Sequence, residues 1–86
     1  PLLLQASPNP FRNQVKIGFQ VEKQGPARLE LYNLRGQRLA VLQEKILTRG
    51  VHHLDWNPDS GLKPGIFLLK LSSNGKCSTL RLALIK

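Results

Sequence analysis

The chain has 86 residues, a single cysteine, no methionine and a formal net charge of +8 at pH 7. This length allows one compact domain, and the lone cysteine excludes an internal disulfide framework and a cysteine-based zinc cluster. The thirteen lysine and arginine residues are dispersed, and no apolar run approaches the ~20 residues of a membrane span, so we expect neither nucleic-acid binding nor membrane insertion.

Apolar residues recur at every second position along most of the chain, and turn residues interrupt them at intervals of roughly eight to twelve. Both features favour strands over helices and are typical of a sandwich or barrel. An extended piece at residues 2–6 comes first, and Pro8 and Pro10 then force a turn. A strand over residues 14–21 follows, with four apolar side chains on one face: Val15, Ile17, Phe19 and Val21.

Shorter strands are predicted in the middle of the chain, at residues 27–33, 38–42, 43–49 and 51–56. The stretch at 43–49 has the weakest alternation of the four. Gly36 and Gly50 supply turns before two of these segments. The strand at 51–56 places His52, Leu54 and Trp56 on one face.

The last hairpin can be registered from the sequence. Asn74 and Gly75 are the preferred pair for a two-residue type I′ turn, which sets Ser73 opposite Lys76. Counting back from the turn pairs Phe67 with Leu82, Leu69 with Leu80 and Leu71 with Ser78. Cys77 falls on the opposite, mixed face, where we expect an accessible thiol. The sequence therefore predicts an all-β, antiparallel sandwich of about seven strands.

Candidate metal sites are weak. His52 and His53 are neighbours on a strand and point to opposite faces, so they cannot hold one ion together. Residues 55–61 carry oxygen ligands at alternate positions, as at the start of a calcium loop, but Pro58 interrupts them and Ile66 stands where the bidentate glutamate belongs. We expect a turn capped by Asx side chains and no metal or cofactor.

Catalysis is not expected either. The two histidines and two aspartates lie on one connection, without a nucleophile elbow. The aromatic residues mostly fall on inward-facing positions, and only Tyr32 shares an outer face, with Arg28 and Glu30. A stacking platform for sugars or bases is therefore not predicted.

Five segments, in this order and spacing, resemble one family, the C-terminal sorting domain of type IX secretion. They are SPNPF at 7–11, LYNLRGQ at 31–37, GVHHLDW at 50–56, LKPGIF at 62–67 and RLALIK at 81–86. The resemblance covers nearly the whole chain. Phe67 is a departure, because the family usually has tyrosine after this glycine.

The resemblance implies an immunoglobulin-like β-sandwich at the extreme C-terminus of a secreted protein. It implies passage from the periplasm across the outer membrane, followed by release or by surface attachment through a sortase, with the translocon and a shuttle protein as further partners. Since the chain opens at Pro1 and lacks methionine, we expect residues 1–86 to be a single sorting domain, excised from a larger secreted protein.

The resemblance also suggests roles for particular residues. A first set is expected to fill the core or to allow turn geometry: Pro8, Asn9, Pro10, Phe11, Gly36, Gly50, Trp56 and Gly65. For recognition we expect the last hairpin, with the basic residues Lys70, Lys76, Arg81 and Lys86.

Two other functions share this fold class: the immunoglobulin-like assembly module of flagellar hook-capping proteins, and a carbohydrate-binding or spacer module of a surface hydrolase. The C-terminal lysine ending favours sorting over the first. The inward-facing aromatics disfavour the second. We also expect weak self-association through an edge strand.

Overall fold

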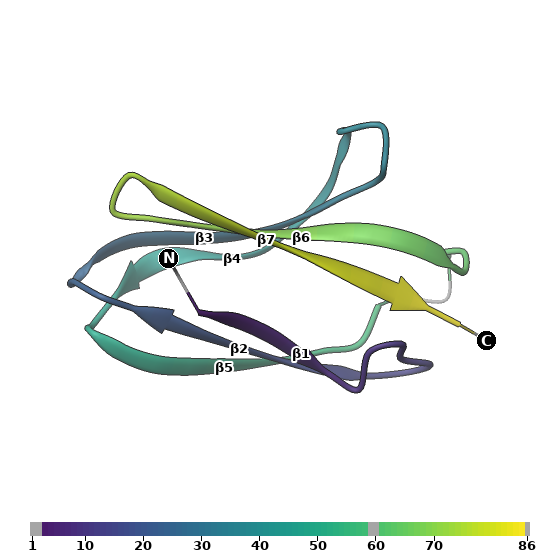
Figure 1. Ribbon diagram of the computed structural model, residues 1–86, viewed down its shortest axis with the longest axis horizontal. Coiled ribbons are helices and arrows are strands. Elements are labelled where there is room, and N and C mark those ends of the chain that lie inside the picture. The colour runs from purple at the N-terminus through teal and green to yellow at the C-terminus, as the bar shows by residue number, and fades with distance from the viewer. Residues whose placement is uncertain (1–2, 59–60, 86) are drawn as a thin grey trace.

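The computed structural model describes residues 3–58 and 61–85, and these residues form seven strands and no helix (Figure 1). The strands are β1 (Leu4–Ser7), β2 (Val15–Val21), β3 (Gly25–Tyr32), β4 (Arg38–Leu47), β5 (Gly50–Trp56), β6 (Gly65–Ser73) and β7 (Lys76–Leu84). They build two antiparallel sheets, with strand orders β1-β2-β5 and β4-β3-β6-β7. The two sheets stack face to face (Figure 1), which confirms the predicted immunoglobulin-like, all-β sandwich.

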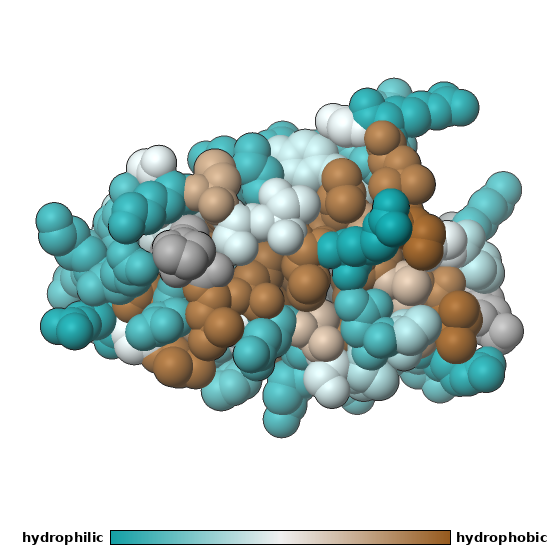
Figure 2. All heavy atoms as spheres, viewed as in Figure 1, coloured by the Kyte–Doolittle hydropathy of each residue, from teal (hydrophilic) through white to brown (hydrophobic). Residues whose placement is uncertain are grey.

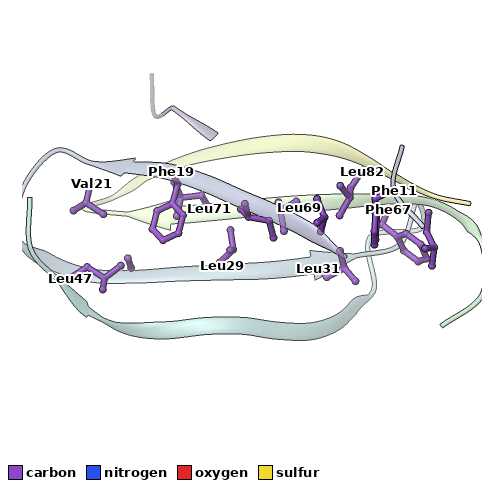
Figure 3. Close-up of a cluster of buried hydrophobic side chains, with 14 residues drawn as sticks. Phe11, Phe19, Val21, Leu29, Leu31, Leu47, Phe67, Leu69, Leu71 and Leu82 are labelled. Atoms are coloured by element: carbon purple, nitrogen blue, oxygen red, sulfur yellow. The ribbon is translucent and has the colours of Figure 1, made fainter. Parts of the chain in front are cut away.

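The core lies between the sheets, where Figure 3 shows the labelled side chains gathered. The alternation in β2 predicted this correctly, because Val15, Ile17, Phe19 and Val21 are all fully buried. The remaining buried hydrophobic residues are Phe11, Ala27, Leu29, Leu31, Leu47, Phe67, Leu69, Leu71, Leu82 and Leu84. Each large side chain of this kind contributes ~1.5–3 kcal/mol when it leaves water.

The expected break between residues 42 and 43 is wrong. β4 is one continuous strand, Arg38–Leu47, paired with β3 along its length. Register shifts at Leu29/Glu30 and Leu31/Tyr32 leave one extra β4 residue at each step. Each bulge reverses the side-chain parity of the strand, so the alternation that identifies a strand in a sequence is lost.

The predicted register of the last hairpin is confirmed in every pair. Ser73 lies opposite Lys76. Phe67 pairs with Leu82, Leu69 with Leu80 and Leu71 with Ser78, as predicted. Asn74 and Gly75 have φ values of 53° and 76°, as a type I′ turn requires. Cys77 is exposed, also as expected.

The segment that follows β1 crosses to the other sheet and borders the outer edge of β7. The Asn9 side chain donates from Nδ2 to the Arg81 carbonyl (2.8 Å) and accepts at Oδ1 from the Ala83 N–H (3.0 Å). The Phe11 N–H then donates to the Ala83 carbonyl (2.9 Å), and the Phe11 carbonyl accepts from the Ile85 N–H (2.8 Å). We call residues 9–11 the edge arch, because they cover the C-terminal half of this edge.

Candidate functional site

The outer face of the four-stranded sheet carries the side chains that point away from the core. Neighbouring strands align them in rows. Glu30 of β3 lies opposite Lys70 of β6, and Lys70 lies opposite Thr79 of β7. The next row joins Tyr32 through Leu68 to Arg81.

Glu30 is the centre of a charged cluster on this face. It is only 3% exposed, although it does not point into the core. Its Oε2 lies 3.2 Å from Nη1 of Arg38, whose side chain is about half exposed. Nζ of Lys70 lies 5.8 Å from the centroid of the Tyr32 ring, within the range of a cation–π contact. Because a buried carboxylate is costly without a charged partner, Glu30 holds Arg38 in place.

With Arg81 in the adjacent row, the same face presents three cations: Arg38, paired with Glu30, Lys70 opposite Glu30, and Arg81. The Arg38 guanidinium has five N–H donors, and its side chain is about half exposed beside the bond to Glu30. Positive charge on a rigid sheet, with free donors, suits the binding of carboxylate groups. We call Glu30, Arg38, Lys70, Arg81 and Tyr32 the basic cluster.

The structure separates the residues predicted for recognition. Lys70 and Arg81 lie on neighbouring strands in the basic cluster. Lys76 lies at the hairpin end, with Nζ 3.1 Å from Oε2 of Glu22. Lys86 falls outside the described residues.

Sequence reasoning missed Arg38 and Glu30 as site residues. Their ion pair spans the turn between β3 and β4, eight positions apart. Opposite charges on either side of a hairpin turn are a usable signal. Here the bulge beside Arg38 hid the register that brings the two residues together.

The other candidate groups have structural contacts. The His52 ring stacks on Phe19, with centroids 5.8 Å apart, and its Nε2 lies 2.8 Å from the Thr48 carbonyl oxygen. Among residues 3–58 and 61–85, no three His, Cys, Asp or Glu side chains come together as metal ligands. Asp59 and Ser60 of the calcium-like segment lie outside the described residues. No helix able to span a membrane occurs in the part of the chain that the structure describes.

The family model of the secretion system C-terminal sorting domain matches residues 6–86. The chain belongs to this family. The sorting domain is a C-terminal signal for type IX secretion, which exports proteins across the outer membrane to the cell surface or beyond. No curated protein matches the chain.

Within this sorting domain, the motif residues Phe11 and Trp56 meet at one end of the core. Phe11 is fully buried, and its ring lies 6.0 Å from that of the half-buried Trp56. Asn9 borders β7 in the edge arch, between Pro8 and Pro10, both of which follow cis peptide bonds.

The motif glycines of the sorting domain all have positive φ: 85° at Gly36, 135° at Gly50 and 159° at Gly65. Gly50 begins β5 and Gly65 begins β6. Gly36 lies within the β3–β4 turn, in the left-handed region that residues with a Cβ rarely adopt.

Proposed function

We propose that the secretion machinery recognises this sorting domain through the outer face of its four-stranded sheet, and that the domain acts without catalysis. The basic cluster carries the proposal. Lys70 and Arg81 supply charge, and Arg38 supplies directed donors. Lys76, opposite the buried Ser73, lies on the other face of the sheet and pairs with Glu22, so it is not part of this surface.

The physical case rests on rigidity. A folded tag is recognised by its surface, and the basic cluster spans the four strands of one hydrogen-bonded sheet, with Glu30 paired to Arg38. Binding therefore costs less side-chain entropy than it would for free lysines on a loop. The partner surface is expected to be acidic, because charge complementarity directs encounter and register.

The contacts of the candidate base and nucleophile support a non-catalytic role. Thr48 and Phe19 occupy the contacts of His52, and the Cys77 thiol lies 3.7 Å from the hydroxyl of Ser72, not beside a base. A nucleophile without an oriented base is weak at neutral pH.

The partners we propose are those of the secretion route: the translocon, a shuttle protein and a sortase. Recognition by the shuttle or translocon comes first and engages the folded sheet. Release or surface attachment by the sortase then separates the parent protein from the domain.

The test is an export assay in a bacterium with type IX machinery. Residues 1–86 are fused to the C-terminus of a periplasm-directed reporter, and the exported fraction is measured for the wild-type domain and for the Lys70→Glu/Arg81→Glu variant. We expect the double variant to lower export at least about tenfold, since like charges at an interface cost several kcal/mol. Circular dichroism confirms that each variant is folded.

Arg49→Glu is the control for charge reversal away from the basic cluster, because Arg49 is exposed in the connection between the two sheets. Its export should equal that of the wild type. Equal export of the double variant would reject the basic cluster as the recognised surface. A wild-type reporter that stays in the periplasm would reject the sorting function itself.

A further inference from the structure

The turn between β3 and β4, residues 33–37, projects beyond the sandwich (Figure 1). We call it the β3–β4 tip. Leu34 in this tip is 59% exposed, and it lies outside the core cluster. Leu39 and Val41 of β4 are also exposed, and Figure 2 shows hydrophobic side chains gathered below the projecting end.

The tip is held in one conformation by five hydrogen bonds, all of which involve Asn33. Its Oδ1 accepts from the backbone N–H groups of Arg35 and Gln37, each at 3.0 Å. Its Nδ2 donates to Oε1 of Gln37 at 2.7 Å. Two backbone bonds of 3.0 Å, Asn33 N–H to the Gln37 carbonyl and Gly36 N–H to the Asn33 carbonyl, complete the turn.

Leu34 is presented to solvent from a turn that hydrogen bonds to Asn33 hold in place. A solvent-exposed turn can be built from polar residues alone, yet here a satisfied network presents a large apolar side chain to water. Preorganised apolar groups bind with little further loss of entropy. Interface hot spots are enriched in arginine, and the tip places Arg35 directly beside the exposed leucine.

Charge indicates the kind of partner. Arg35 lies next to Leu34 and is exposed, and residues 33–37 contain no acidic side chain. A complementary surface therefore has an apolar pocket for the leucine and carboxylates at the rim of that pocket. An anionic membrane would instead call for a cluster of roughly four to eight cations, which the tip lacks.

We propose that the β3–β4 tip is a second docking element, in which Leu34 enters an apolar pocket of a partner protein and Arg35 pairs with a carboxylate at its rim. The inference rests on the proposed function, because the partner is a component of the secretion machinery. The tip and the basic cluster then form two separate contacts, one apolar and one electrostatic.

The test uses the same reporter with Leu34→Ser and, separately, Arg35→Glu. We expect each to lower export at least about fivefold, as the loss of an interface anchor does, with an unchanged thermal midpoint. Ile46→Ser is the matched control, because Ile46 is 70% exposed near the other end of β4. It should export like the wild type.

One outcome would reject the β3–β4 tip as a docking element and leave the proposed function standing. In it, Leu34→Ser and Arg35→Glu both export at wild-type levels while Lys70→Glu/Arg81→Glu loses export. Failure of the wild-type reporter would overturn both. The isolated domain is also sedimented with vesicles containing phosphatidylserine. Binding that Leu34→Ser abolishes would replace the protein partner with a lipid surface and so overturn the proposal.

Discussion

Asn9 takes the place of a backbone segment at the edge of β7. Its side-chain amide has the same donor and acceptor as a peptide group, and both are used, toward the Arg81 carbonyl and the Ala83 N–H. Phe11 continues the pattern with its own backbone. An exposed strand edge can pair with another chain, so a single side chain protects part of this one.

Replacing Asn9 should therefore lower the stability of the domain more than most substitutions at surface positions do. We expect Asn9→Ala to lower the free energy of unfolding by about 1–3 kcal/mol, because the groups it leaves on β7 lose their partners. Asn9→Asp keeps the acceptor for the Ala83 N–H and should lose less. Urea denaturation measures both, and equal midpoints for Asn9→Ala and the wild type would refute the role assigned to Asn9.

The last hairpin and β4 show what local sequence can and cannot predict about an element. The Asn74-Gly75 turn fixes its register by chemistry within a few residues, so every pair was predictable. The course and register of β4 were not predictable, because its two bulges depend on how β3 fits between β4 and β6. The sequence carries no local signal for a bulge without glycine.

The same distinction applies to the site. Strand parity was enough to place Lys70 and Arg81 on one face. The pair between Lys76 and Glu22 joins residues 54 positions apart, and Glu30 is flanked by neighbours from β4 and β6. Contacts of this kind arise only from the tertiary fold.

The turn chemistry of the hairpin can be tested with two glycines. Gly75→Ala should lower stability by about 1–2 kcal/mol, because φ is 76° and a Cβ is disfavoured there. Gly18→Ala is the control in β2, where the new Cβ would lie 3.4 Å from the His53 ring, an ordinary contact. It should be neutral or slightly stabilising. Similar losses at both sites would contradict this account of the turn.

At the scale of the whole molecule, β7 closes the sandwich. Leu82 and Leu84 belong to the core, and the backbone of residues 81–85 holds the edge arch. Deleting residues 81–86 removes both at once. We expect this deletion to unfold the domain, because losing one buried leucine alone costs ~2–5 kcal/mol.

Circular dichroism and thermal unfolding measure the effect, with Arg81→Ala as the control that keeps Leu82 and Leu84 in place. A cooperative transition in the deletion variant would show that residues 81–86 are dispensable for folding. Export lost on deletion therefore reports the loss of the fold, which is why charge reversal is the cleaner probe of recognition.

Self-association is a further property of the whole chain. A net charge of +8 opposes contact between copies, and salt screens that repulsion. We expect a monomer at low ionic strength and weak association through an uncovered edge in ~0.5 M salt, where the Debye length is only a few ångströms. Sedimentation velocity at high protein concentration tests this, and monomer alone in both buffers would exclude edge pairing.

Asn9 of the edge arch bonds to Arg81 and Ala83, which lie 72 and 74 positions later in the sequence. The sandwich can therefore close only after β7 has been synthesised. A ribosome that stops early would leave a parent protein whose tag has neither its last core residues nor a partner for Asn9. The sorting domain of such a chain could not fold. We therefore expect a parent protein truncated before β7 to lack a folded sorting domain and to stay in the periplasm.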